Sequence, residues 1–253
     1  MMKKIILVTG ATSGFGKAIA TRFAQDGNDI IITGRRKERL DDLKERLENE
    51  FGSKVLTLCF DVRKLPEVEQ AVATLPEPWK AIDILVNNAG LAVGLNPVHE
   101  GVVDDWERMI DTNIKGLLYM TRVISPLMVA RGKGHIINIG SIAGREVYPN
   151  GNVYCGSKFA VDAITKGMRI DLLPYGIKVT QVAPGAADTE FSLVRFKGDK
   201  TRADNVYKGF TPLSGEDVAE VVFYCANQPA HVNINDLVIM PTDQASSMHF
   251  HKT

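Results

Sequence analysis

The sequence predicts a doubly wound α/β fold, in which one parallel sheet is covered by helices on both faces. Two observations lead to this prediction. Short apolar runs rich in β-branched residues alternate along the chain with longer amphipathic segments, the order of strand–helix–strand units. The runs are continuously apolar, as in strands buried on both faces. No linker or internal repeat divides the chain, so we expect a single domain over residues 1–253.

Seven apolar runs are the expected strands, and none shows the strict alternation of a sheet with one solvated face. These runs are Ile5–Val8, Ile30–Thr33, Val55–Phe60, Ile84–Val86, Ile136–Ile139, Val179–Val182 and Leu237–Met240.

Six amphipathic segments are the expected helices. In the clearest of them, Leu40, Leu43 and Leu47 form one apolar stripe among charged residues. The segments are Lys17–Gln25, Lys37–Asn49, Val68–Thr74, Asp104–Val129, Tyr154–Leu173 and Gly215–Asn227. The stretch Ala186–Pro212 is too long and too polar for a simple connection, so we expect a lid over the substrate there.

Composition argues for a small-molecule partner. Thirty basic side chains balance thirty acidic ones, and this formal net charge of +0 argues against nucleic acid or an anionic membrane. The first apolar run is too short for a signal peptide, and no stretch approaches the roughly 18 apolar residues of a membrane span. The three cysteines form no CxxC pair, so neither a disulfide framework nor a metal site is indicated. We expect a cytoplasmic protein.

A glycine-rich turn after the first expected strand predicts a dinucleotide site. Gly10, Gly14 and Gly16 have the spacing GxxxGxG and directly precede a helix. Glycines permit close backbone approach, so that free N–H groups at the helix start can face a pyrophosphate. A glycine-rich turn without a ligand is the alternative.

Two arginines after the second expected strand predict NADP as the cofactor. An acidic residue at this position would bind the ribose hydroxyls of NAD. Arg35 and Arg36 stand there instead, and guanidinium groups pair well with a 2′-phosphate. For Arg36 alone, the alternative that it begins the charged face of the next helix stays open.

Tyr154 and Lys158 are the expected catalytic pair, because residues four apart on a helix share one face. Bringing the pKa of a tyrosine from about 10 to ~7 requires roughly 4 kcal/mol of preference for the phenolate. An ammonium ~4 Å away supplies about that much at an effective dielectric of about 20. Lys158 is therefore expected to tune Tyr154 and to bind the nicotinamide ribose.

Ser141 and Asn113 complete this set. The Ser141 hydroxyl follows the fifth strand and can donate to a carbonyl oxygen where negative charge grows during hydride transfer. Asn113 stands inside a helical pattern that asparagine does not favour. Taken singly, each feature has a plain alternative: a chance YxxxK spacing, a turn serine and a solvated asparagine.

These residues together resemble the short-chain dehydrogenase/reductase family over essentially the whole chain. The resemblance also rests on Asn87-Asn88-Ala89-Gly90 at the end of the fourth strand, and on Pro184-Gly185 followed by Thr189. It implies a Rossmann-type fold with seven parallel strands. Tyr154 would be the general acid/base and Ser141 would polarise the carbonyl. Lys158 would position the cofactor, and Asn113 would hold a water for proton relay.

The family pattern also implies a cofactor site and an assembly. The expected cofactor-binding residues are Gly10, Ala11, Thr12, Ser13, Gly14, Phe15, Gly16, Arg35, Arg36, Asp61, Val62, Asn88, Ala89, Gly90, Tyr154, Lys158, Pro184, Gly185 and Thr189. The implied assembly is a homodimer or homotetramer that pairs the two long helices, residues 104–129 and 154–173.

The last third of the chain resembles the NADP-dependent 3-hydroxy acid dehydrogenase branch of the family. Members of that branch oxidise serine-like and other 3-hydroxy acids and reduce semialdehydes such as malonic semialdehyde. The sequence departs from the branch at residues 145–148, just after the expected catalytic serine, which leaves the substrate preference open. Segments that carry the resemblance are Val153-Tyr154, Thr189-Glu190-Phe191-Ser192 and the stretches 194–199 and 229–235.

A carboxylate substrate requires a cation in the pocket. Arg195 and Lys197 in the expected lid and Arg145 after the catalytic serine are the candidates, with Ser141 at the reacting oxygen. Each of the three cations could equally be a solvated surface residue. Two other functions stay open: a reductase of uncharged ketones, sugars or 3-oxoacyl groups, and an inactive NADP-binding sensor.

Overall fold

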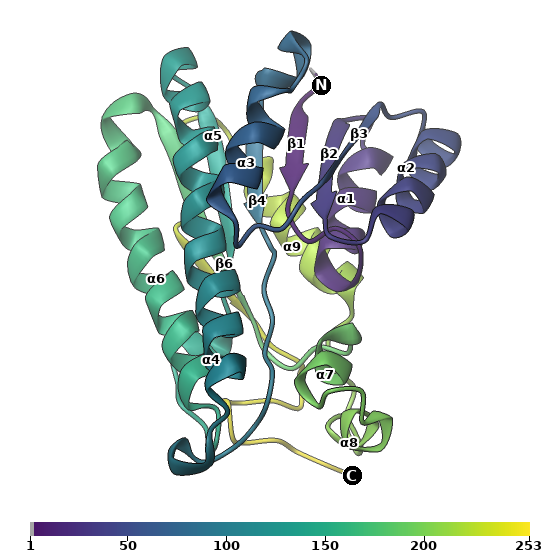
Figure 1. Cartoon of the computed structure of the whole chain (residues 1–253), viewed down its shortest axis with the longest axis vertical. Coiled ribbons are helices and arrows are strands. Elements are labelled where there is room, and N and C mark those ends of the chain that lie inside the picture. The colour runs from purple at the N-terminus through teal and green to yellow at the C-terminus, as the bar shows by residue number, and fades with distance from the viewer. Residues whose placement is uncertain (1–2) are drawn as a thin grey trace.

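Seven strands form one parallel sheet in the computed structural model, which describes residues 3–253 (Figure 1). Their order is β3-β2-β1-β4-β5-β6-β7, and every neighbouring pair is parallel. The predicted seven-stranded parallel sheet is thereby confirmed. The first two residues of the predicted domain 1–253 lie outside the described residues.

The strands begin and end within two residues of their predicted positions. They are β1 (Ile5–Val8), β2 (Asp29–Gly34), β3 (Val55–Cys59), β4 (Ile84–Asn87), β5 (Gly134–Ile139), β6 (Ile177–Pro184) and β7 (Asp236–Ile239).

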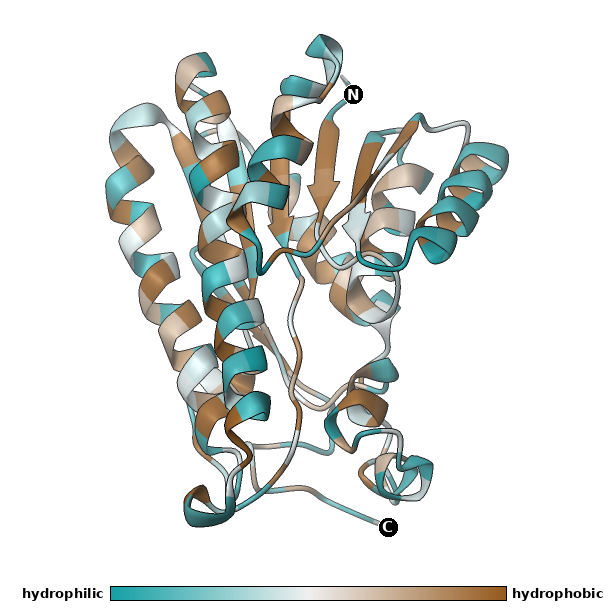
Figure 2. Ribbon diagram, in the orientation of Figure 1, coloured by the Kyte–Doolittle hydropathy of each residue, from teal (hydrophilic) through white to brown (hydrophobic). Residues whose placement is uncertain are grey.

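Two apolar clusters hold helices against opposite faces of this sheet. One face carries α1 (Gly14–Gln25), α2 (Lys37–Phe51) and α9 (Gly215–Ala226), and the other carries α3 (Leu65–Ala73), α5 (Leu117–Arg131) and α6 (Asn152–Leu172). Figure 2 shows strands that are mainly hydrophobic and helices that alternate hydrophobic and hydrophilic surface. This is the predicted doubly wound arrangement, because strands buried on both faces have no solvated side.

The remaining helical segments are short. They are α4 (Val103–Ile110), α7 (Glu190–Arg195), α8 (Lys200–Asn205), the π turn η3 (Asp111–Gly116) and the 3-10 turns Glu77–Lys80, Val98–Glu100, Ile142–Gly144 and Leu173–Tyr175.

The long helix predicted over residues 104–129 is present from Val103 to Arg131, but its middle turn is wider than an α-helix. Between α4 and α5 the chain makes the π turn η3. The Asn113 side chain there accepts a hydrogen bond from the Leu91 N–H (2.8 Å) and donates one to the Leu91 carbonyl (2.9 Å). These two bonds tie the turn to the loop after β4, a tertiary constraint that a local pattern cannot reveal. Single π turns are often found at functional sites.

The strand order reverses between β1 and β4, so the loops that follow these strands run in opposite directions away from each other. An open crevice results at the carboxyl edge of the sheet. The segment predicted as a lid, residues 186–212, contains α7 and α8 and lies at this edge (Figure 1). The C-terminus ends beside it, where the Thr253 N–H donates to the Gly209 carbonyl.

A matched pair of glycine substitutions tests how tightly the loop after β5 packs on α6. A Cβ at Gly144 would lie 2.6 Å from the Lys158 carbonyl oxygen, whereas one at Gly156 meets nothing within 4 Å. We expect Gly144→Ala to destabilise the protein by about 1–3 kcal/mol. Gly156→Ala should instead stabilise it by up to about 1 kcal/mol, because alanine favours a helix. Urea unfolding measures both, and equal stabilities of the two variants would contradict the packing described here.

Candidate active site

A cavity of about 710 Å³ opens at the carboxyl edge of the sheet. It is lined by the loops after β1 to β6, by the segment around α7 and by the C-terminal tail. All of the predicted cofactor residues line it except Ala11 and Gly16. Ser141, Tyr154, Lys158 and Arg195 line it too, so the predicted catalytic and cofactor residues largely meet in one place.

The glycine turn presents an uncapped helix end to this cavity. Ser13, the N-cap of α1, makes no side-chain capping hydrogen bond, and the first turn holds no acidic residue. The backbone N–H groups there are therefore available to an anion, which suits the diphosphate of a dinucleotide. A Cβ at Gly10 would lie 2.9 Å from the Ala89 Cα, so the turn also packs closely on the loop after β4.

Ala11 and Gly16 have structural roles rather than the predicted contact with the cofactor. Ala11 is buried in the apolar core, and its N–H donates to the Thr33 carbonyl. A Cβ at Gly16 would lie only 2.4 Å from the Gly10 carbonyl oxygen, so this glycine lets α1 approach the turn.

Three guanidinium groups gather near the end of β2. Arg36 donates to the hydroxyls of Thr12 and Ser13, and Arg36 and Arg39 both pair with the Glu190 carboxylate of α7 (3.1 and 2.6 Å). Partial burial acts to raise the pKa of Glu190, but the hydrogen bonds from Arg39 and Arg36 outweigh it and hold this pKa below its usual value.

Arg35 belongs to the same group and is mostly exposed, 3.9 Å from the Asp61 carboxylate. Four guanidinium groups, Arg35, Arg36, Arg39 and Arg63, face the two carboxylates Glu190 and Asp61, so this corner of the cavity keeps a positive excess. The residues present therefore fit a dinucleotide that carries a phosphate on its adenosine ribose.

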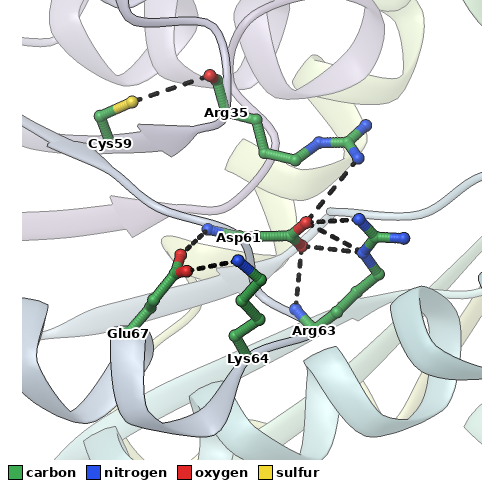
Figure 3. A network of polar contacts seen from close by, with 6 residues as sticks. All are labelled: Arg35, Cys59, Asp61, Arg63, Lys64 and Glu67. Atoms are coloured by element: carbon green, nitrogen blue, oxygen red, sulfur yellow. Dashed lines mark hydrogen bonds and ion pairs between the residues drawn. The ribbon is translucent and has the colours of Figure 1, made fainter.

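Asp61 is held at the cavity edge by a network of polar contacts (Figure 3). Its carboxylate accepts hydrogen bonds from the Arg63 side chain (2.6 Å) and backbone N–H. Burial acts to raise the pKa of Asp61, but the bonds from Arg63 outweigh it and lower this pKa. The Glu67 carboxylate in turn accepts from the Asp61 N–H and pairs with Lys64. Asp61 is thus a positioned cavity residue rather than a plain turn residue.

Tyr154 and Ser141 lie together at the floor of the cavity. The Tyr154 side chain is almost fully buried at the start of α6, and burial raises the pKa of its hydroxyl. The Arg195 charge and a hydrogen bond with Ser141 act in the opposite direction. The Ser141 hydroxyl also accepts from the Ala143 N–H (3.1 Å), which fixes its position after β5. A protonated tyrosine beside a serine hydroxyl can give a proton to an oxygen bound between them.

Lys158 is buried one turn further along α6. Its ammonium donates to the Ile139 carbonyl of β5 (2.9 Å), and burial lowers its pKa to about 8. No carboxylate in the described residues pairs with it, which explains why the charged form is disfavoured.

Arg195 sits in a cage of three aromatic rings. Its guanidinium carbon lies 5.1 Å from the ring centroids of Tyr154 and Phe191 and 5.6 Å from that of Tyr148. One of its nitrogens donates to the Tyr148 hydroxyl (2.7 Å), while Nε is buried without a hydrogen-bond partner. Within residues 3–253 no carboxylate lies at ion-pair distance from Arg195, so its charge faces the cavity unneutralised.

Lys197 and Arg145 do not line the cavity, so the structure does not bring these two predicted substrate residues to the candidate site. Lys197 pairs with the buried Asp105 of α4 (2.8 Å), which draws its ammonium away from the reacting groups. Arg145 pairs with Asp236 at the start of β7. In both cases a carboxylate distant in sequence captures the cation, and local pattern gives no sign of that.

Asn113 also stays outside the cavity. Both hydrogens of its buried amide are donated, one to the Leu91 carbonyl and one to the Ser157 hydroxyl (3.0 Å). The side chain therefore joins the loop after β4 to α6 and has no hydrogen left for a water.

Sequence reasoning missed several residues of the cavity wall. These are aromatic and apolar side chains from four separate segments: Leu91, Leu95, Tyr148, Phe191, Tyr207, Met248 and Phe250. The Tyr207 hydroxyl donates to the Ala187 carbonyl within the lid. The Ser247 N–H donates to the Glu146 carboxylate and so connects the tail to the loop after β5. Tyr148, Phe191 and Tyr207 lay in stretches already connected with the substrate, but no motif singled them out. The tail has no motif that could have pointed to the site.

Among residues 3–253, no helix combines the length and the apolar character of a membrane span. In the same part of the chain, no three His, Cys, Asp or Glu side chains are grouped so that they could hold a metal ion.

Known proteins resemble this chain in sequence. A family model described as short chain dehydrogenase matches residues 4–199. The NADP-dependent 3-hydroxy acid dehydrogenase of Salmonella typhi is 52% identical over 242 residues, which are 95% of this chain and 96% of that protein. Sulfoacetaldehyde reductase 2 of Chromohalobacter salexigens is 49% identical over 247 residues, 97% of each chain.

Among solved structures, the closed form of serine dehydrogenase complexed with NADP+ superimposes with a TM-score of 0.93 and 49% identity. The match covers 98% of this chain and 100% of that one.

Burial of the Lys158 ammonium has a consequence for stability. The folded-state pKa of about 8 lies below the ordinary 10.5, so the charged form costs stability at neutral pH, and this cost fades as pH rises from 8 to 10.5. Lys158→Met should therefore stabilise the protein by about 1–3 kcal/mol at pH 7, with a smaller gain near pH 9.5. Lys166→Met, an exposed change on the same helix, is the control and should have little effect. Denaturant unfolding at the two pH values checks this, and a loss of stability at pH 7 would refute it.

Proposed function

The chain belongs to the short-chain dehydrogenase family, and on that premise we propose that it is an NADP-dependent oxidoreductase of short 3-hydroxy acids. It would interconvert a serine-like 3-hydroxy acid and the corresponding oxo acid or semialdehyde. The observation that carries the substrate class is the unneutralised Arg195 guanidinium beside Tyr154 in the cavity. The names of the relatives support the same chemistry.

Tyr154 and Ser141 are the proposed catalytic residues. When bound, NADP supplies or accepts a hydride at the substrate carbon. Tyr154 gives the proton to the carbonyl oxygen in reduction and takes it from the hydroxyl in oxidation. Ser141 donates a hydrogen bond to the same oxygen, where negative charge develops. The near-complete burial of the Tyr154 ring excludes water from this proton transfer.

The proposed cofactor contacts divide along the cavity. The uncapped start of α1 would hold the diphosphate, and Arg35 and Arg36 would hold the 2′-phosphate. Lys158 would donate to the nicotinamide ribose from its place beside β5. A relay water at Asn113 would have to bind main-chain groups, because the side-chain amide is committed to Leu91 and Ser157.

Arg195 is the proposed anchor for the substrate carboxylate. A guanidinium binds a carboxylate with two parallel hydrogen bonds, and the surrounding rings exclude the water that would weaken them. Residues 186–212, which carry Arg195 on α7, would act as the lid over the substrate.

The cytoplasmic location and the homodimer or homotetramer also stay predictions. Exposed apolar side chains on the α4–α6 side, among them Ile110, Leu118 and Phe159, support an assembly through these helices.

A first prediction concerns the cofactor. Arg36→Ala should lower kcat/KM for NADPH at least tenfold, about 1.4 kcal/mol, and leave kcat/KM for NADH nearly unchanged. The reason is that only NADPH has the phosphate that this guanidinium would neutralise. Steady-state kinetics with both cofactors measure the effect, and an equal loss with NADH would argue against the assignment.

A second prediction concerns the substrate. Removing Arg195 should cost about ten- to a hundred-fold in kcat/KM for a 3-hydroxy acid, the value of one charged hydrogen bond, and little for its methyl ester. Lys197→Ala is the matched control from the same lid. It should change kcat/KM for the acid and for the ester by the same factor, because Lys197 faces Asp105. Tyr154→Phe should abolish turnover of both substrates.

Steady-state kinetics of Arg195→Ala and Lys197→Ala with both substrates test the proposal. If kcat/KM for the acid and for the ester falls equally in Arg195→Ala, or if the wild type prefers the ester, the reductase of uncharged ketones becomes the better assignment.

A further inference from the structure

Arg195 lines the cavity and also lies against the ring of Tyr154. Its guanidinium carbon stands 5.1 Å from the centroid of the Tyr154 ring, inside the aromatic cage. The Phe191 ring meets Tyr154 edge-on at 5.6 Å, so Arg195 and Tyr154 share a largely apolar enclosure. Charges interact strongly in such surroundings because little water screens them.

Tyr154 is faced by groups from each element packed against it. Helix α6 contributes Cys155 and Lys158. The loop between β5 and α6 contributes Ser141 and Tyr148. The lid contributes Arg195 from α7 and Tyr207 from beyond α8. Burial raises the pKa of Tyr154, and the nearby Cys155 and Tyr207 raise it further. Arg195 and Ser141 act in the opposite direction and lower it. Of these opposing groups only Arg195 carries a charge.

Lys158 supplies a charge over only part of the pH range in which a tyrosine titrates. Its ammonium points at the Ile139 carbonyl, and burial lowers its pKa to about 8. It therefore loses its charge at a lower pH than an ordinary tyrosine loses its proton. An arginine keeps its charge over that whole range.

We propose that Arg195 is a positioning residue for the reacting proton, whose charge favours the ionised form of Tyr154 until a substrate anion neutralises it. The proton donor would thus respond to the substrate. With an empty or uncharged cavity the phenolate forms more readily than it does with a carboxylate at Arg195, and the bound carboxylate favours the protonated phenol, which is the form that reduction of an oxo acid consumes. This second half rests on the proposed function, whereas the first half does not.

The test is a pH titration of the Tyr154 phenolate absorbance in the protein saturated with NADP+. Subtracting the curve of the matching Tyr154→Phe protein removes the signal of the other five of its six tyrosines. Arg195→Gln should raise the midpoint by about one pH unit or more, as expected for a unit charge at this separation. Arg195→Lys keeps the charge and should recover at least half of the shift.

Arg202→Gln is the matched control. Arg202 also lies over an aromatic ring, 4.6 Å from that of Phe196, but it does not line the cavity. Its loss should leave the Tyr154 midpoint unchanged. A shift equal to that of Arg195→Gln would mean that any change in the lid perturbs Tyr154 and would overturn the proposal.

The response to an anion is tested with propionate, which has a carboxylate but no hydroxyl to oxidise, and with uncharged propionamide. Propionate should raise the wild-type midpoint, propionamide should not, and neither should act on Arg195→Gln. The comparison of propionate with propionamide on the wild type does not depend on the folding of Arg195→Gln. A midpoint that propionate leaves in place overturns the coupling.

The outcome separates this inference from the proposed function. If Arg195→Gln loses its preference for the acid over the ester while the Tyr154 midpoint stays fixed, Arg195 anchors substrate without tuning the tyrosine. If the midpoint moves but kcat/KM for the acid and for the ester falls equally, Arg195 tunes the tyrosine and the proposed substrate class is wrong.

Discussion

The pairing of β1 with β4 is the contact on which the rest of the site depends. Leu7 pairs with Leu85 and Val8 with Val86, and at this junction the strand order reverses. Thr9 then locks the two following loops together, since its hydroxyl accepts from the N–H groups of Asn88 and Ala89. The glycine turn and the loop after β4 are thereby held as facing walls, and the crevice between them becomes the cavity.

The charges within that cavity are sorted along its length. Arginines gather at the end of β2, where a phosphate would be bound, and a single unneutralised guanidinium stands near Tyr154. Between them lies a buried lysine whose pKa has fallen to about 8. The acidic side chains nearby are already paired: Asp61 with Arg63, and Glu190 with Arg36 and Arg39. The cavity therefore offers positive charge to an anion at each of its two ends.

Alpha helix α7 connects these two ends. Its first residue, Glu190, is held by arginines at the cofactor end, and its last, Arg195, lies against the reacting tyrosine. A helix of six residues spans the two positions, so the proposed cofactor and substrate contacts would be linked through it. The Lys197–Asp105 pair just beyond joins the same segment to α4.

The sequence by itself determined the sheet, its main helices and most of the residues that line the cavity, because each depends on local spacing. Short continuous apolar runs rich in β-branched residues favour buried strands, the glycine turn follows β1, and Tyr154 and Lys158 share a face because a helix has 3.6 residues per turn. Tertiary structure decided which cations face the cavity. Arg195, Lys197 and Arg145 look alike in sequence, yet Asp105 and Asp236 capture the latter two from 92 and 91 residues away, whereas no carboxylate in residues 3–253 reaches the first. The π turn at Asn113 and the tail residues Met248 and Phe250 were likewise settled by contacts distant in sequence, where local periodicity holds no information.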